Sequence, residues 1–284
     1  MPAPPVIFDP AARQRAQRRA DTQPVTFLDE AAQVEIEERL AEVNRAFQSP
    51  VVIGPRAAAW AARVLPGAET RPDLDALELE VGGHDLALHA LALHAANDPV
   101  GQLIQMRRAL RPDGLMLACL PAGRTLHELR TALAEAEAET RGGLSPRVAP
   151  MGEIRDLGAL LQRAGFALPV ADSVTLTVTY PDLRALFLDL RGMGETNILA
   201  ARDRRIPPRR LFARAEALYR QAFGLPDGRL PATVELVFLT GWAPAATQPQ
   251  PLRPGSAAMR LADALGTKEH DAGDPIDPGV RKGK

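Results

Sequence analysis

The sequence predicts an open α/β fold. Two stretches support this prediction. Residues 51–53 are a short apolar run that reaches Gly54 and then an Ala-rich helical pattern, which is the strand, turn and helix that open a nucleotide-binding α/β fold. Residues 84–88, 99–110 and 115–120 read as strand, helix and strand, which is the order of a parallel crossover.

The composition excludes several functional classes. The chain has 284 residues, 46% of them hydrophobic, and a net charge of −1, so nothing indicates global nucleic-acid binding. No apolar run reaches about 18 residues, so no integral membrane segment is expected. The single cysteine, Cys119, lies in the apolar run 115–120 and is predicted to be buried in a strand. Because no internal disulfide is possible and the N-terminus lacks the pattern of a secretory signal, we expect a cytoplasmic protein.

The first 48 residues are predicted to form an N-terminal helical extension. Four arginines, Arg13, Arg15, Arg18 and Arg19, fall within seven positions. They could be the solvated face of a helix, or they could hold an acidic partner or the substrate. Residues 29–47 place apolar side chains at helical spacing and are predicted to form an amphipathic helix.

The core domain is predicted to span residues 49–244 and to begin with the strand 51–53 and the helix 56–64. Leu77, Leu79 and Val81 alternate with glutamates, which predicts a short strand. The strand 84–88 and the helix 99–110 follow, and the helix ends at a Pro-Asp-Gly turn before the strand 115–120.

In the second half of the domain, Thr125 and Glu128 have the spacing of a capping box at the start of a helix over residues 125–141. Glycines at 142 and 165 end this helix and the next one, over residues 151–164. Residues 174–180 alternate Thr with apolar side chains, as an antiparallel strand does. Helices over 182–191 and 209–222 and a strand over 234–240 complete the domain. The tail, 245–284, is poor in apolar residues and is predicted to be largely disordered.

Several strings resemble the class I S-adenosylmethionine-dependent methyltransferase superfamily. Residues 84–98 look like its fourth strand and the loop that follows, and residues 110–115 look like the turn before its fifth strand. More specifically, residues 142–147 (Gly-Gly-Leu-Ser-Pro-Arg) and 189–197 (Asp-Leu-Arg-Gly-Met-Gly-Glu-Thr-Asn) resemble the mitochondrial and proteobacterial complex I assembly factors of this superfamily. That family is similar to the acyl-carrier methyltransferase of the biotin pathway.

This resemblance implies a Rossmann-like α/β fold, with a mixed sheet of seven strands and helices on both faces. It also implies that S-adenosylmethionine binds at the carboxyl ends of the first strands. The family's first turn reads roughly Asp-x-Gly-x-Gly-x-Gly, whereas only Gly54 remains here, followed by Pro55 and Arg56. The acidic residue that holds the ribose has three candidates, Glu69, Asp73 and Asp75, of which we take Asp73. The short interval between Gly54 and His84 predicts that a helix and a strand are reduced or lost.

The altered turn predicts weak or absent cofactor binding. A proline at position 55 removes a backbone donor and fixes φ. Each missing hydrogen bond to a charged group costs about 1.5–3 kcal/mol, so two or three losses weaken binding roughly 10³-fold or more. The alternative is that Arg56 compensates by pairing with the carboxylate of S-adenosylmethionine.

The candidate site residues lie in loops expected at one end of the sheet. Catalytic candidates are Asn97, Asp98 and Glu195, although Asn97 and Asp98 could equally cap the helix that follows. Two glycine-containing loops, which could instead simply end helices, supply the substrate-binding candidates Arg141, Ser145, Arg147 and Asn197. A further candidate, Arg130, lies behind these loops on the predicted helix 125–141. His84, His89 and His94 recur at a spacing of five, which suits neither a helix face nor one face of a strand, so no metal site is predicted.

Three functions remain open at this stage. The resemblance implies action on a protein, a subunit of the respiratory NADH dehydrogenase (complex I), in assembly or modification; in the family this activity is described as arginine hydroxylation. The second possibility is an active S-adenosylmethionine-dependent methyltransferase acting on a small molecule or a carrier-bound acid. The third is a binding module without catalysis.

Overall fold

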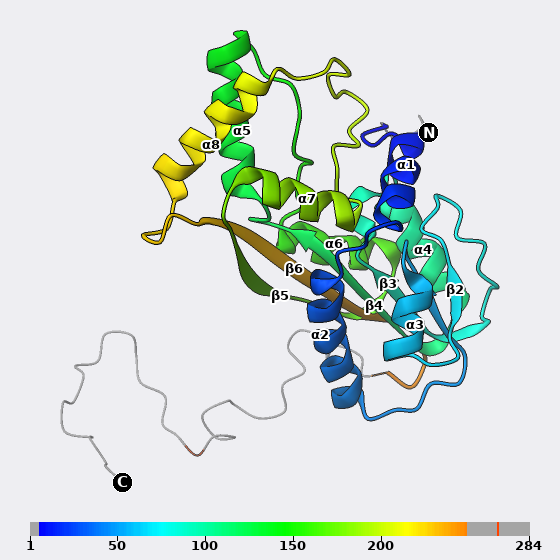
Figure 1. The fold of residues 1–284 in the computed structure, drawn as a ribbon. Helices are drawn as coiled ribbons and strands as arrows, with labels where there is room; N and C mark the ends of the chain where they lie inside the picture. The colour runs from blue at the N-terminus through cyan, green and yellow to red at the C-terminus, as the bar shows by residue number, and fades with distance from the viewer. Residues whose placement is uncertain (1–5, 249–265, 267–284) are drawn as a thin grey trace, which may run out of the picture. The chain divides into compact units, whose positions relative to one another are not determined.

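One sheet of six strands organises the folded unit (Figure 1). The structure is a computed structural model and describes residues 6–248 and Gly266. The strands lie in the order β2-β1-β3-β4-β6-β5. Their bounds are β1 Pro50–Ile53, β2 Glu69–Arg71, β3 His84–Ala90, β4 Leu110–Ala122, β5 Ala167–Tyr180 and β6 Leu230–Trp242. The neighbours β2, β1, β3 and β4 are parallel, whereas β6 is antiparallel to both β4 and β5, so the predicted mixed α/β sheet is confirmed.

The prediction of seven strands was wrong by one. Among the described residues, the segment 72–83 between β2 and β3 contains neither a helix nor a strand. Leu77 is buried there, but its backbone N–H donates to the side chain of Gln105 on the helix α4 (Pro99–Ala109), not to a neighbouring strand. The predicted strand at residues 77–81 is therefore a loop. With so few residues between the strands, the chain has no length for another crossover.

Helices cover both faces of the sheet, as predicted. On one face, α4 and α6 (Ile154–Ala164) pack against alternate residues of β1, β3, β4 and β6. On the other face, α2 (Phe27–Val43) and α3 (Ala57–Val64) pack against the intervening residues of the same strands. The strands β3 and β4 are buried on both faces, which explains why they read as continuous apolar runs.

A further apolar cluster lies at the ends of β5 and β6. It joins α5 (His127–Arg141), α7 (Leu183–Met193) and α8 (Arg209–Phe223). The N-terminal helix α1 (Pro10–Ala20) packs through Ala12 and Ala16 against the segment that follows α7. The residues after β3, which include the short 3₁₀ turn Leu93–Ala95, complete that contact. The chain therefore returns its first helix to the carboxyl end of the parallel strands.

The ends of α5 and α6 show which of the predicted helix-start and helix-stop signals form in the structure. The glycines at 142 and 165 end α5 and α6 in the left-handed conformation, as predicted. The capping box at the start of α5 was wrong, because Leu126 occupies the cap position. The Thr125 hydroxyl accepts from the backbone N–H of Glu235 on β6 and donates to the Ala122 carbonyl. Glu128 accepts from the backbone and hydroxyl of Thr233 on the same strand. Contacts with a distant strand thus take the groups that would have closed the box.

Contacts divide the chain into two units, Met1–Ala245 and Ala246–Lys284. All of the elements above belong to the first unit. The tail predicted to be disordered, 245–284, lies outside the described residues except for 245–248 and 266. The proposed boundary between an extension (1–48) and a core domain (49–244) remains a prediction.

Candidate functional site

The turn after β1 lies where the fold would place a cofactor. A Cβ atom at Gly54 would come within 2.6 Å of the Ala90 carbonyl oxygen, so this glycine permits the close approach of two neighbouring strands. Its backbone N–H donates to the Arg71 carbonyl on β2. The donor that such a turn could offer to a ligand is therefore already used within the sheet.

Arg56 follows this turn and is bound by α2. Its guanidinium group forms an ion pair with Asp29, with Nε 3.1 Å from Oδ1, and the indole Nε1 of Trp60 donates to the same oxygen at 2.8 Å. The Asp29 side chain is only 7% exposed. Arg56 therefore neutralises a carboxylate of this chain and is not free to pair with the carboxylate of a ligand.

Asp73, the candidate for holding a ribose, is bound by α1. Arg13 lies 2.5 Å from its carboxylate and also donates to the Ala92 carbonyl at 3.0 Å. Burial raises the pKa of Asp73 above its ordinary value, although Arg13 opposes the shift. Glu69 pairs with Arg71 instead. Both predicted cofactor-binding side chains, Arg56 and Asp73, are thus occupied by the N-terminal helices.

The space beside the turn is small. A cavity of about 40 Å³ is bounded there by Leu28, Pro55, Arg56, His94 and Glu195 among others, whereas ligand pockets commonly measure about 300–1,000 Å³. A separate groove of about 470 Å³ runs between α1 and the loop 72–75. The residues present around the first turn therefore do not fit S-adenosylmethionine in this conformation.

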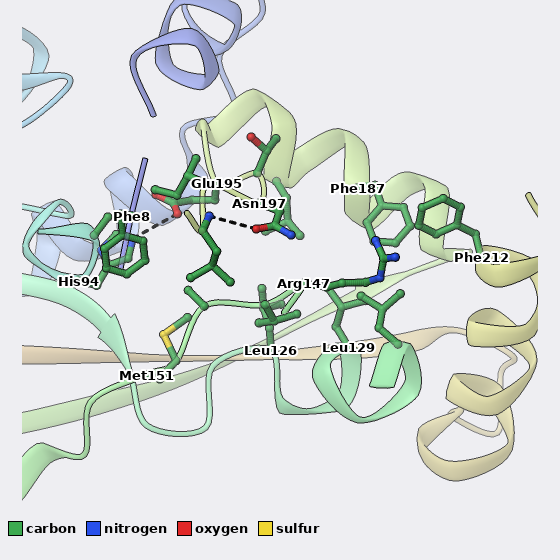
Figure 2. Close-up of a pocket in the computed structure, with 18 residues that line it drawn as sticks. Phe8, His94, Leu126, Leu129, Arg147, Met151, Phe187, Glu195, Asn197 and Phe212 are labelled. Atoms are coloured by element: carbon green, nitrogen blue, oxygen red, sulfur yellow. Dashed lines mark hydrogen bonds and ion pairs between the residues drawn. The ribbon is translucent and has the colours of Figure 1, made fainter. Parts of the chain in front are cut away.

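A larger apolar cavity of about 320 Å³ lies next to this closed turn (Figure 2). His94 and Glu195 line both cavities. Figure 2 shows this pair at one end of the larger cavity and Phe187 and Phe212 at the other. The remaining lining side chains are mainly aliphatic and include Leu126, Leu129, Leu133, Met151, Leu190, Ile198 and Leu199. The cavity can therefore accept the apolar part of a ligand along its lining and place the Glu195 carboxylate beside the polar end of that ligand.

Glu195 is the charged group at that end. Its carboxylate lies 3.2 Å from Nε2 of His94. Burial raises the pKa of Glu195, but the charge and hydrogen bond of His94, helped by Arg13 and Arg56, outweigh burial and hold this pKa below its ordinary value. The Glu195 side chain is 42% exposed, whereas that of His94 is 6% exposed. Glu195 is therefore an ionised acceptor within reach of a ligand.

The predicted substrate-binding arginines converge on a residue that sequence reasoning missed. Glu137 of α5, whose side chain is 2% exposed, accepts from the Ser145 hydroxyl at 2.7 Å, from Arg147 at 2.6 Å and from Arg141 at 3.3 Å. Burial raises the pKa of Glu137, but Arg147 and Ser145 outweigh it and lower this pKa. The spacing of four residues between Glu137 and Arg141 on a helix was the available signal.

The structure places the other candidates on backbone groups. Arg130 donates to the Ala149 carbonyl, and Asn197 donates to the Pro146 carbonyl. Asn97 accepts from the backbone of Ile7 and Phe8 and donates back to Phe8, so it ties down the N-terminal segment. Asp98 caps α4 by accepting from the Gly101 N–H, which is the role predicted for it as the alternative to catalysis. Of these candidates, only Asn197 lines the 320 Å³ cavity.

The three histidines do not form a cluster. His89 is fully buried beside Gln102, and burial lowers its pKa to about 3. His84 contacts the Ser49 carbonyl, and His94 contacts Glu195. Within residues 6–248 and at 266, no group of His, Cys, Asp and Glu side chains could hold a metal ion. No helix in the same part of the chain is long and apolar enough to cross a membrane.

Comparisons with known proteins complete this description. No protein-family model matches the chain. It is 36% identical over 199 residues to "Arginine-hydroxylase NDUFAF5, mitochondrial" of Danio rerio, covering 70% of this chain and 62% of the relative. It is 30% identical over 206 residues to the malonyl-(acyl-carrier protein) O-methyltransferase of Gallionella capsiferriformans, covering 72% of this chain and 67% of the relative.

Among solved structures, a Bacillus halodurans protein assigned as a methyltransferase aligns with a TM-score of 0.47 at 14% identity, over 74% of this chain and 99% of that one. The NDUFAF5 relatives are longer than the aligned region. The chain spans 42% of the length of the Dictyostelium discoideum protein and 57% of the human one.

Proposed function

We propose that this chain acts on a protein in the assembly or subunit modification of respiratory complex I. The premise is its family: the chain belongs to the class I methyltransferase family that contains the arginine hydroxylase NDUFAF5 and malonyl-(acyl-carrier protein) O-methyltransferase. In this proposal the binding of S-adenosylmethionine is weakened or lost. The partner is a subunit of the NADH dehydrogenase, as the sequence resemblance implies. We place the protein in the cytoplasm, although the NDUFAF5 relatives are described as mitochondrial.

The observation that carries the proposal is the difference between the two neighbouring cavities. The space beside Gly54 measures only about 40 Å³, and the ion pair between Asp29 of α2 and Arg56 borders it. The adjoining cavity of about 320 Å³ remains open. A chain that closes its cofactor space and keeps its substrate space is suited to binding a substrate without a tightly held methyl donor.

In this proposal the larger cavity receives a side chain of the protein partner. The aliphatic lining accommodates the apolar part of that side chain. Glu195, kept ionised by His94, is the acceptor for a donor group at its end. Arg147, compensated by Glu137, lines the same cavity without adding a free charge. Asn97 and Asp98 hold the N-terminal segment and α4 in place, and we assign them no chemical step.

Isothermal titration with S-adenosylmethionine tests the cofactor part of the proposal. We expect no heat at millimolar ligand, because the ion pairs between the helices and the turn would have to open first. Micromolar binding would instead favour an active methyltransferase acting on a small molecule or a carrier-bound acid. One observation favours that second candidate: the groove of about 470 Å³ that borders Asp73 could admit a nucleoside without the first turn.

Affinity purification from the native host tests the partner. We expect respiratory NADH dehydrogenase subunits to be recovered with the wild-type protein and to be depleted with Glu195→Gln, which removes the charged acceptor at the end of the cavity. Asp156→Gln, a change to an exposed acid on α6, serves as the matched control. Failure to recover any such subunit with the wild-type protein would contradict the assembly role.

A further inference from the structure

The two edges of the sheet differ in length and in charge. At one edge, β2 has three residues, and two of them are the charged Glu69 and Arg71. At the other edge, β5 has fourteen residues and is the outermost strand in Figure 1. Short or charged edge strands resist pairing with another chain, whereas a long uncharged edge is a template for it. The edge of β5 is therefore the one suited to pairing with a further strand.

The hydrogen bonds of β6 show which of its residues bond to β5. The Thr233 carbonyl accepts from the Leu126 N–H at 2.8 Å, and the Glu235 N–H donates to the Thr125 hydroxyl at 2.9 Å. Both bonds run to the segment before α5 and at its first turn, on the side of β6 away from β5. Because alternate residues of an antiparallel strand bond to opposite sides, the even-numbered residues of β6 are those that bond to β5.

The register between the two strands then identifies the outward-facing backbone groups of β5. Residues 170–180 pair with β6 without a shift, and even-numbered residues lie opposite even-numbered ones, as Val174 lies opposite Leu236. The odd-numbered residues Ser173, Thr175 and Thr177 therefore direct their N–H and C=O groups away from β6. No strand lies on that side in the part of the chain that the structure describes.

This outward-facing stretch is bounded at both ends. Near its start, Leu168 has a positive φ of 49°, Pro169 follows, and the pairing with β6 is irregular. A bulge and a proline both prevent continuous pairing at an edge. Near its end, Arg229 binds the hydroxyl and the carbonyl of Thr179. The stretch 173–178 lies between these limits and contains no charged side chain.

The stretch is complementary to a second copy of itself. In an antiparallel pair centred on Thr175, that residue lies opposite its own copy, Ser173 lies opposite Thr177, and Val174 lies opposite Leu176. The three hydroxyl-bearing side chains are exposed and meet on one face, whereas the two apolar ones are half-buried and meet on the other. Pairs of these kinds stabilise neighbouring strands.

Charge is also compatible with a second copy as the partner. Asp172, the one charged residue of β5, would lie opposite the uncharged Val178 of the other copy. Its carboxylate is already paired with Arg39 of α2. No like charges would therefore meet along the strand pair, and the uncharged stretch offers nothing to select a charged peptide instead.

We propose that two copies of this protein associate through β5, in an antiparallel pair centred on Thr175. The pair joins the two sheets into one across a two-fold axis, with the same surface used by both copies. Since the stretch is much smaller than a standard interface of about 1,600 Å², the dimer is weak and forms in a concentration-dependent manner. This association is independent of any cofactor and of the proposed function.

Sedimentation velocity of the full chain over a range of concentrations tests the association. We expect the sedimentation coefficient to rise from that of a monomer toward that of a dimer. Thr175→Lys places two cations opposite each other and should weaken the dimer about fivefold or more. Thr131→Lys, at an exposed threonine on α5, adds the same charge away from β5 and should dimerise as the wild-type protein does. Circular dichroism verifies that both variants are folded.

Disulfide cross-linking tests the register of the pair. The native thiol of Cys119 is buried and does not interfere. Thr175→Cys should cross-link to its own copy under mild oxidation, because the Cα atoms of such a pair lie about 5.5 Å apart. Ser173→Cys and Thr177→Cys should each remain monomeric on a denaturing gel when oxidised alone, and they should cross-link when the two proteins are mixed.

Hydrogen exchange identifies what covers the edge. The amides of Ser173, Thr175 and Thr177 should become protected as the protein concentration rises. Protection that does not depend on concentration would mean that a segment of the same chain covers the edge, and it would overturn the proposal. The proposal would also fail if the wild-type protein stayed monomeric at every concentration, if Thr175→Lys dimerised as well as Thr131→Lys, or if Ser173→Cys cross-linked to itself as fast as Thr175→Cys.

Discussion

Replacing Asp29 by Asn tests whether the ion pair between α2 and the first turn stabilises this fold. The carboxylate contacts Arg56 through both oxygens and accepts from Trp60 at 2.8 Å, while remaining 7% exposed. An asparagine keeps one oxygen for Trp60 but turns an N–H donor toward the guanidinium group. Breaking a buried pair costs about 3–5 kcal/mol, and a single hydrogen bond to a charged group is worth about 1.5–3 kcal/mol.

Because Arg56 keeps 18% of its side chain exposed and can rehydrate in part, we expect a loss of about 2–3 kcal/mol in the free energy of unfolding. Urea denaturation followed by far-UV circular dichroism measures this change. Glu37→Gln on the same helix is the control, since its pair with Arg63 is 40% exposed on both sides and should contribute less than about 1 kcal/mol. If Asp29→Asn proved no more destabilising than this control, the argument that α2 secures the turn would be refuted.

Three further predictions follow from single side chains. Gly54→Ala should destabilise the protein by about 1–3 kcal/mol, since its Cβ would meet the Ala90 oxygen. The control Gly158→Ala, inside α6, should be neutral or stabilising by up to about 1 kcal/mol. Equal urea midpoints for the two variants would argue against the close approach of Gly54 to Ala90. Because the pKa of Glu137 is lowered in the folded protein, its ionised carboxylate should stabilise the fold above about pH 4.5, the ordinary pKa of the group, and this contribution should disappear as the pH falls through the lower folded pKa. Glu137→Gln should therefore reduce the loss of unfolding free energy over this acidic pH range in pH-dependent urea titrations. An unchanged slope would contradict the assignment. Burial raises the pKa of Cys119 to about 12, so this thiol should react with Ellman's reagent only after unfolding, and rapid labelling of the native protein would disprove the placement.

Much of the fold could be predicted from local pattern. The apolar runs that became β1, β3 and β4, the alternation of β5 and the glycines after α5 and α6 all report on immediate neighbours in the chain. The failures have a common cause. Thr125 and Glu128 bond to β6, which lies about a hundred residues away. The segment 77–81 pairs with no strand in the part of the chain that the structure describes. A capping box or an alternating pattern indicates that a segment can start a helix or form a strand, but its contacts with distant parts of the fold decide whether that structure forms.

The candidate site divides in the same way. The sequence by itself determined that this is an α/β chain with only one glycine in its first turn, because strand, turn and helix signals are local. Only the tertiary structure decided what became of the space beside that turn, since Arg13 and Asp29 reach Asp73 and Arg56 across 60 and 27 positions of the chain. It also decided that Glu137, Ser145 and Arg147 meet, and that His94 and Glu195 face each other. Electrostatic pairing in a buried site depends on distance in space, which spacing along the chain does not specify beyond a helical turn or two.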